Sequence, residues 1–248
     1  MSAAKVSREK IEKKLILQFF RNRRNGVFIE VGANEPVSPA SQTWYLEDQH
    51  GWTGVLVEPI LELAQAADKS RPRSRIFQVA CGRPDQKGTA TFYIPSTQET
   101  EISTHACLKK GTDGRLFEMY REQQVEVKPL NEIIDEAGLQ NIDLLSIDTE
   151  GTELDVLKGL DLKKHRPGLI LLEDKHVFLN KHLYLKRHGY KAAKRMGMNT
   201  WYIPKGVPFS FTSFGEKLKL FKHLYLSLIP RKIKAATRLR TWRPLLHL

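Results

Sequence analysis

Two short apolar segments of the sequence each have a carboxylate at or near their C-terminal end, and a lone glycine follows the first of them. Residues 27–31 contain Glu30 and are followed by Gly32, while the second apolar segment, 54–57, is followed by Glu58. Glycine allows a tight turn and the close approach of a ligand to the backbone. Glu58 comes 26 residues after Gly32, near the spacing at which an acid binds the hydroxyls of a ribose in nucleotide-binding folds. These residues predict a site for a ligand that carries a ribose.

The charge of this segment favours a cationic ligand over a dinucleotide. A pyrophosphate is usually bound by a G-x-G-x-x-G turn at a helix N-terminus, and the residues after Gly32 lack the other two glycines. Glu30 and Glu35 would also repel a phosphate. S-adenosylmethionine (SAM) carries a ribose, a sulfonium and an ammonium group, and it suits such an acidic site. The alternative is an ordinary strand, turn and helix with acids on the surface.

If SAM is the ligand, a second candidate motif, "SIDTEG" at 146–151, would supply groups for transfer of its methyl group to a hydroxyl. The acceptor oxygen must face the methyl group in line, and a nearby base helps a hydroxyl to react. Asp148 ends a predicted strand and is the first choice for a base or for a group that orients the acceptor. Glu150 could bind the acceptor or stabilise the start of the next helix, where Thr152 could be the N-cap. His176 could serve as a base at neutral pH, or its position could be incidental.

Further polar groups lie near these candidates. Oxygen ligands suit Mg²⁺, so four carboxylates could hold one, or they could simply pair with lysines: Asp148, Glu150, Glu173 and Asp174. The long polar segment 96–114 is expected to be a functional or mobile loop, and its His105 could belong to a lid over the acceptor.

The candidates require a scaffold that brings strand ends together. Strands are expected at 27–31, 54–57, 74–80, 142–147 and 169–172, and helices at 38–49, 60–69, 130–136, 152–157 and 178–187. The segments 190–196 and 199–204 are expected to form a closing hairpin. This alternation is typical of an α/β fold with a mostly parallel sheet and helices on both faces. Ligands bind beyond the carboxyl ends of such strands, where the candidate acids would gather.

Two stretches resemble the FkbM-type family of SAM-dependent methyltransferases. "FIEVGANEPVSPASQTWYLEDQHGWTGVLVEP" is similar to the opening of these domains, and "IDLLSIDTEGTELDVLKGLDL" followed by "RPGLILLE" is similar to their second signature. The resemblance covers about residues 26–204. It implies a class I methyltransferase (Rossmann-like) fold, SAM as the methyl donor, and methylation of a hydroxyl oxygen, often on a sugar.

The resemblance also implies roles for individual residues. Glu30, Gly32 and Asn34 would line the methionine part of SAM, and Glu58 would hold the ribose. The adenine would be flanked by Val79, Ala80 and Cys81. The chain departs from the family where Glu35-Pro36 replaces a frequent glycine, which stiffens the loop and puts a contact from residue 35 in doubt.

The net charge of +12 is concentrated at the two ends of the chain. Residues 1–25 carry +6 and residues 205–248 carry +9, so 26–204 carries −3. We expect three parts accordingly: a basic N-terminal helix at 1–25, a methyltransferase domain at 26–204 and a basic amphipathic extension at 205–248. The first would present an apolar stripe of Ile11, Leu15 and Phe19 over 5–24.

The basic extension predicts a partner. Leucines and aromatic residues recur at helical spacing among lysines and arginines, which favours an anionic membrane surface. A glycan-assembly enzyme, the protein's own domain, or plain solvent exposure of a charged tail are the alternatives. An apolar stripe at either end could also build a homodimer.

The location follows from what the sequence lacks. It has no apolar run of about 18 residues and no signal-peptide pattern at its N-terminus. Cys81 and Cys107 fit a reducing compartment. We expect a cytoplasmic protein, peripheral to the inner membrane.

The expected function is that of a SAM-dependent O-methyltransferase. Its acceptor would be a sugar hydroxyl of a surface polysaccharide, such as a lipopolysaccharide or O-antigen, or of another glycoconjugate. An RNA ribose methyltransferase is an alternative, but the acidic domain and the lack of an Asn-Pro-Pro-aromatic motif argue against a nucleic acid. A non-catalytic scaffold of a glycan-assembly complex is a second alternative, against which the presence of Glu58 and Asp148 argues.

Overall fold

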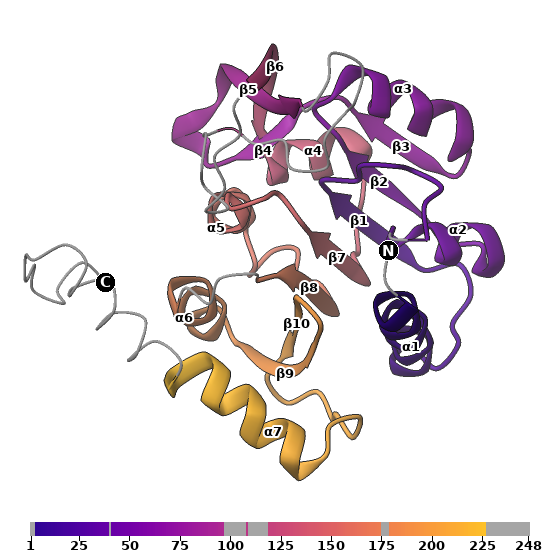
Figure 1. The fold of residues 1–248 in the computed structure, drawn as a ribbon, viewed down its shortest axis with the longest axis vertical. Coiled ribbons are helices and arrows are strands. Elements are labelled where there is room, and N and C mark those ends of the chain that lie inside the picture. Colours follow the sequence, from indigo (N-terminus) through magenta and orange to yellow (C-terminus); the bar gives the residue numbers. More distant parts are fainter. Residues whose placement is uncertain (1–2, 40, 97–107, 109–118, 175–178, 227–248) are drawn as a thin grey trace, which may run out of the picture.

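A seven-stranded sheet forms the centre of the molecule (Figure 1). The computed structural model describes residues 3–39, 41–96, 108, 119–174 and 179–226. The strands run in the order β3–β2–β1–β7–β8–β10–β9, and β10 alone runs in the direction opposite to the other six. Their bounds are β1 Val27–Val31, β2 Thr53–Val57, β3 Ser74–Phe77, β7 Leu144–Ile147, β8 Leu169–Glu173, β9 Tyr190–Met196 and β10 Asn199–Pro204. The predicted α/β fold and closing hairpin are confirmed.

Helices cover both faces of this sheet (Figure 1). One face is covered by α4 Leu130–Ala137, α5 Glu153–Lys158 and α6 Leu179–Arg187, and the other by α1 Ala3–Phe19, α2 Trp44–His50 and α3 Leu61–Ser70. The chain then continues into α7, Phe214–Phe221, and a π-helical turn, Lys222–Leu226, beside β9. Among the described residues, no helix combines the length and apolar character needed to cross a bilayer.

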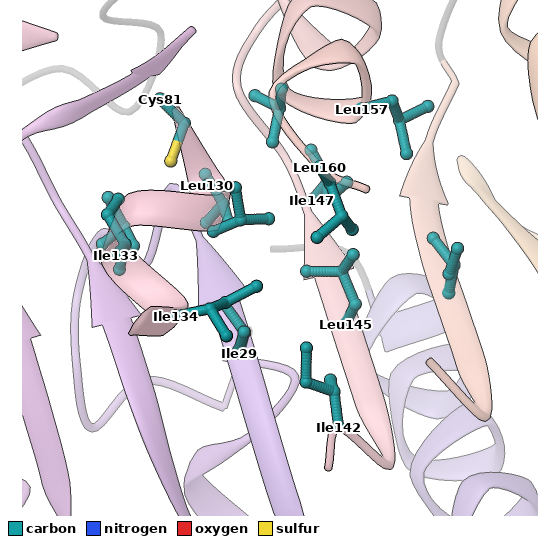
Figure 2. Packing of buried hydrophobic residues seen from close by; sticks show 14 of the residues in the cluster. Ile29, Cys81, Leu130, Ile133, Ile134, Ile142, Leu145, Ile147, Leu157 and Leu160 are labelled. Atoms are coloured by element: carbon teal, nitrogen blue, oxygen red, sulfur yellow. The ribbon is translucent and has the colours of Figure 1, made fainter. Parts of the chain in front are cut away.

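The alternation of side chains along β1 divides the core into two layers. Ile29 and Val31 belong to the layer under α4, α5 and α6, where Figure 2 shows Ile29 near Ile134 and Leu145. Phe28 points into the opposite layer, with Trp52 and the helices α1 to α3. Successive residues of a strand face opposite sides, so Glu30 must share the face of Phe28.

A small second sheet lies beside α4 and α5. It consists of β4 Ala80–Gly82, β6 Met119–Pro129 and β5 Gly88–Ser96, with a 3₁₀ turn at Pro84–Gln86. The expected single strand over 74–80 is therefore wrong: β3 ends at Phe77, and the chain resumes as β4, which pairs with β6. That break turns 79–81 out of the main sheet and toward the rim.

Two helix predictions also need correction. The expected helix at 38–49 begins only at Trp44, because Ser41 and Thr43 hydrogen-bond to Glu30 instead of entering a helix. The N-terminal helix ends at Phe19 rather than Arg24, and the chain turns through Arg21 at a positive φ of 54°.

The inward face of α1 also differs from the predicted stripe. Ile11 is half exposed, whereas Ile16 is fully buried and Glu12 is 4% exposed. The Glu12 carboxylate accepts hydrogen bonds from Trp201 Nε1 (2.7 Å) and Asn199 Nδ2 (2.9 Å) of β10. Burial raises the pKa of Glu12, against the lowering effect of these hydrogen bonds. A buried carboxylate thus fixes α1 to the sheet, which the apolar periodicity of the helix did not indicate.

Candidate active site

A pocket lies at the carboxyl ends of the central strands. With its open mouth it spans about 550 Å³, and residues from the ends of β1, β2 and β7 line it together with β4 and β5. The candidates that the structure brings together there are Gly32, Asn34, Glu58, Val79, Ala80, Cys81, Asp148 and Glu150. Glu30 and Glu35 are not among its lining residues.

Glu58 is a buried acid held by two backbone hydrogen bonds. It directly follows β2 and is 4% exposed. Its Oε2 accepts a hydrogen bond from the Asn34 backbone N–H (2.7 Å), and its Oε1 accepts one from the Ile60 N–H (2.9 Å). Burial raises the pKa of Glu58 to about 7, although both hydrogen bonds act to lower it. Each oxygen still has lone pairs, so the carboxylate is oriented to accept hydrogen bonds from a diol.

The turn after β1 brings the backbone close to the end of β7. Gly32 has φ +79°, and its N–H donates to the Val57 carbonyl at 2.9 Å. A Cβ atom added at Gly32 would lie 1.9 Å from the Asp148 carbonyl oxygen. Asn34 is also at a positive φ, 51°, and its side-chain oxygen accepts from the Glu35 N–H. The turn therefore needs glycine both for its conformation and for its space.

Three carboxylates gather beside the pocket, and Asp148 and Glu150 of this group line it. One oxygen each of Asp148, Glu150 and Glu173 lies within 4.8 Å of the others. Glu150 and Glu173 are buried, whereas Asp148 is exposed. Glu150 has φ 53°, which places it at the corner between β7 and α5. Such oxygen donors could hold a divalent cation. Asp174, the fourth predicted ligand, lies outside this group.

Glu30 has a different place from the predicted one. It is 5% exposed, and its carboxylate accepts hydrogen bonds from Ser41 Oγ (3.0 Å), the Gln42 N–H (2.8 Å) and Thr43 Oγ1 (2.5 Å). It thus faces the loop that leads into α2, on the side of the sheet away from the pocket lining. Instead of lining the pocket, it holds the loop that carries Asn34.

Arg71 stabilises the same loop from α3's end. It is 1% exposed, and it donates to Glu47 Oε2 (2.7 Å), to the Pro36 carbonyl (2.9 Å) and to Thr43 Oγ1 (2.9 Å). Residues 35 and 36, where the chain departs from the family pattern, are thereby fixed by a buried cation, and Glu35 points into solvent.

An apolar wall adjoins Glu58. The predicted residues Val79, Ala80 and Cys81 are all buried, and burial raises the pKa of the Cys81 thiol far above its usual range. The lining also includes residues that the sequence did not assign to the cofactor site, namely Ile60, Leu63, Phe92, Leu108, Thr149 and Thr152. Ile60 and Leu63 could have been inferred, since they follow Glu58 directly, but Phe92 comes from a strand of the second sheet.

Thr152 occupies the N-cap position of α5, as predicted. Thr152 makes no capping hydrogen bond; its hydroxyl donates to the Thr149 carbonyl instead. Glu153 Oε1 accepts from the Gly151 N–H at 2.7 Å, so it holds the turn after Glu150.

A buried ion cluster supports the acidic side of the pocket. Lys181 Nζ of α6 lies 3.1 Å from both Glu153 Oε2 and Asp174 Oδ1, and all three side chains are less than 10% exposed. Burial lowers the pKa of Lys181, but the two carboxylates outweigh this, and the pKa lies above its usual value. Lys181 therefore ties the turn that carries Glu150 to the end of β8.

Replacing Lys181 with methionine should destabilise the protein. Two buried carboxylates would lose their shared cation, which costs about 3–5 kcal/mol of the free energy of unfolding. Urea titration measures this loss in the free energy of unfolding. Lys186→Met, on the exposed face of the same helix, is the control and should change stability by less than about 0.5 kcal/mol. Equal stability of the two variants would contradict a structural role for the cluster.

Three candidates lie outside the described residues, namely His105, Cys107 and His176. Their predicted roles as lid residue, free thiol and alternative base stay predictions.

Comparison with known proteins identifies the domain. The family model described as "Methyltransferase FkbM domain" matches residues 30–192, about two thirds of the chain. Methyltransferase 1 from Beauveria bassiana (strain ARSEF 2860) is 34% identical over 92 residues, which cover 34% of this chain and 37% of that protein. The match thus spans little more than a third of that relative's length.

Two solved structures of methyltransferases align with most of this chain. Methyltransferase FkbM from Methylobacillus flagellatus KT aligns with a TM-score of 0.45 and 17% identity, over 73% of this chain and 43% of that chain. The precorrin-6y C5,15-methyltransferase from Geobacter metallireducens GS-15 aligns with a TM-score of 0.41 and 13% identity, over 77% and 85%.

Proposed function

This chain belongs to the FkbM methyltransferase family, and we propose that it transfers the methyl group of SAM to a hydroxyl oxygen of a sugar. The observation that carries the proposal is Glu58, a buried carboxylate oriented by two backbone N–H groups between a glycine turn and an apolar wall. This is the arrangement that a ribose with an attached adenine requires, because the diol donates hydrogen bonds while the base needs apolar contacts.

Different parts of the pocket suit the ribose, the adenine and the methionine part of SAM. Glu58 would accept hydrogen bonds from the two ribose hydroxyls, and Ile60, Val79 and Phe92 would pack against the adenine. The turn at Gly32 and Asn34 would pass beside the methionine part. The bound cofactor supplies an electrophilic methyl group on its sulfonium. An acidic pocket attracts such a cation.

Asp148 would act on the acceptor side of the reaction. It lies at the end of β7, where Gly32 approaches its backbone, and its exposed carboxylate can reach an incoming hydroxyl. A carboxylate there can accept the hydroxyl proton as the oxygen attacks the methyl group, and it can fix the oxygen in line. Glu150 and Glu173 would bind other hydroxyls of the acceptor, or with Asp148 would hold Mg²⁺.

The acceptor class follows from the acids around Asp148. Carboxylates are good acceptors for the many hydroxyls of a sugar, and an anionic acceptor such as a nucleic acid would meet repulsion there. We therefore propose a glycan or glycolipid, such as a surface polysaccharide precursor, at the cytoplasmic face of the membrane.

Transfer of label from methyl-labelled SAM tests this proposal. The full chain is incubated with sugars, polysaccharide fragments and lipid-linked oligosaccharides, and the product is treated with mild alkali, which cleaves methyl esters but leaves methyl ethers. We expect alkali-stable label in a sugar. Asp148→Asn should lower turnover by about a hundredfold or more, because a base contributes that much, and should leave SAM affinity within about threefold.

Asp68→Asn, on the exposed face of α3, is the matched control and should keep full turnover. Label that alkali releases, or label in RNA rather than in any glycan, would overturn the sugar hydroxyl as acceptor. Full turnover of Asp148→Asn would remove Asp148 from the mechanism.

A further inference from the structure

A basic hollow lies between α6, β9 and α7, at the edge of the sheet farthest from β3. With its mouth it spans about 940 Å³. Four lysines line it, Lys186, Lys191, Lys205 and Lys217, and no acidic residue is among the lining residues that the structure describes. Lys191 and Lys205 each donate to a backbone carbonyl, of Val207 and of Lys186, so both ammonium groups are held beside the hollow.

The hollow is part of how α7 docks. Leu220 and Leu224 are buried and pack beside Ala192 of β9. Tyr225 hydrogen-bonds through its hydroxyl to His182 Nε2 of α6 at 2.8 Å. These contacts fix α7 against the domain and leave the lysine-lined space between the elements.

His182 forms part of the wall of the hollow. Its side chain is 5% exposed and lines the hollow, yet its Nδ1 has no hydrogen-bond partner among the described residues. A buried polar atom without a partner is costly.

The outward face of α7 is apolar beside the hollow. Phe214, Leu218 and Phe221 are 83%, 46% and 51% exposed, and their spacing of four and three residues places them on one stripe. Lys219 and Lys222 are also exposed on this helix. An apolar stripe flanked by lysines is the pattern of a helix that lies in the plane of a membrane surface.

We propose that this hollow binds the phosphate of an anionic membrane lipid while the stripe of α7 enters the interfacial layer. Four ammonium groups provide the charge for the phosphate, and Phe221, shared by the hollow and the stripe, provides the contact with the acyl region. The proposal goes beyond methyl transfer and does not depend on it.

Charge argues against the other occupants. The sequence 227–248 contains six Lys/Arg and no Asp or Glu, so it would be repelled by a basic hollow. A second copy of the chain, paired through α7, would set Lys217, Lys219 and Lys222 against the same lysines.

Sedimentation with vesicles tests the proposal. The full chain is mixed with phosphatidylcholine vesicles, with or without about 30% phosphatidylglycerol, at about 0.1 M salt where screening is moderate. We expect binding to the anionic vesicles alone. Lys186→Gln/Lys217→Gln should weaken it about tenfold or more, since two surface charges are lost. Phe214→Ser should weaken the binding that persists at higher salt.

Lys69→Gln/Lys163→Gln is the matched control, since it removes the same net charge from exposed positions away from the hollow. Equal binding by the two double variants would assign the attraction to the overall charge or to 227–248 and overturn the proposal. The proposal would also be overturned if the wild-type protein did not bind anionic vesicles or bound only an acidic protein. It would likewise be overturned if millimolar inorganic phosphate released the protein from the vesicles as effectively as competing anionic lipid does. SAM affinity should be unchanged in both double variants, which separates this outcome from any failure of the proposed methyl transfer.

Discussion

Glu58→Gln should lower the affinity for SAM by more than about a hundredfold. The wild-type carboxylate would accept two hydrogen bonds from the ribose, and hydrogen bonds to a charged group contribute about 1.5–3 kcal/mol each. Glutamine offers one acceptor oxygen and places an amide donor against the N–H of Asn34 or Ile60, both of which donate in the wild type. Calorimetric titration of SAM into the full chain measures the difference.

The same residue should make SAM binding depend on pH. The ribose needs the ionised carboxylate, whose pKa in the free protein is raised to about 7 by burial. Affinity should therefore be constant well above pH 7 and fall by about tenfold per pH unit well below it. Glu58→Gln should lack this dependence.

Stability should depend on pH in the opposite direction. The folded protein holds the proton of Glu58 more tightly than the unfolded chain, whose carboxyl has the ordinary pKa of 4.5. The stabilising contribution is complete below pH 4.5 and is lost as the pH rises through 7, a change of about 3 kcal/mol. The free energy of unfolding of Glu58→Gln, relative to wild type, should increase by about this amount over the same range.

Glu35→Gln is the control for both measurements, because Glu35 lies in the same loop but is exposed and outside the pocket. It should change SAM affinity by less than about threefold. Tight binding of SAM by Glu58→Gln would remove the proposed ribose contact, and no binding by well-folded wild type would remove the SAM site itself.

The sequence predicted the parts of the site that depend on strand ends. Parallel strands place their carboxyl ends at one rim, so Glu58, Asp148 and Val79 could be brought together from their positions after apolar segments alone. Phe92 could not, because β5 belongs to the second sheet, and its path toward the pocket depends on the break between β3 and β4.

Glu30 shows a prediction that strand alternation could have corrected. It lies one residue before the end of β1 and shares its face with Phe28, so its side chain points toward α1 and α2 rather than beyond the strand end. The resemblance to the family assigned Glu30 to the methionine part of SAM. The alternation of side chains along a strand instead turns Glu30 toward residues 41–43, to which it is hydrogen-bonded. Glu12 was missed for a related reason, since a buried carboxylate interrupts the apolar pattern on which helix faces are read.

Gly32→Ala should be far more destabilising than an alanine at another glycine of similar conformation. Gly189 has φ +83°, and a Cβ there would have no heavy atom within 4 Å. Gly189→Ala should therefore cost only the conformational penalty, about 1–2 kcal/mol. Gly32, at φ +79°, carries that penalty and places its Cβ 1.9 Å from the Asp148 carbonyl oxygen.

The alanine at Gly32 can be accommodated only if the ends of β1 and β7 separate. That movement would weaken the hydrogen bond from the Asp148 N–H to the Val31 carbonyl (3.0 Å), so we expect a total loss of more than about 4 kcal/mol. Urea titration of both variants gives the difference. Because Gly32 and Asp148 would lie on the donor and acceptor sides of the reaction, whatever fraction of Gly32→Ala folds should also bind SAM more weakly than Gly189→Ala. Equal losses in the two variants would show that the strand ends can separate freely, and that this close approach does not set the geometry between the cofactor turn and Asp148.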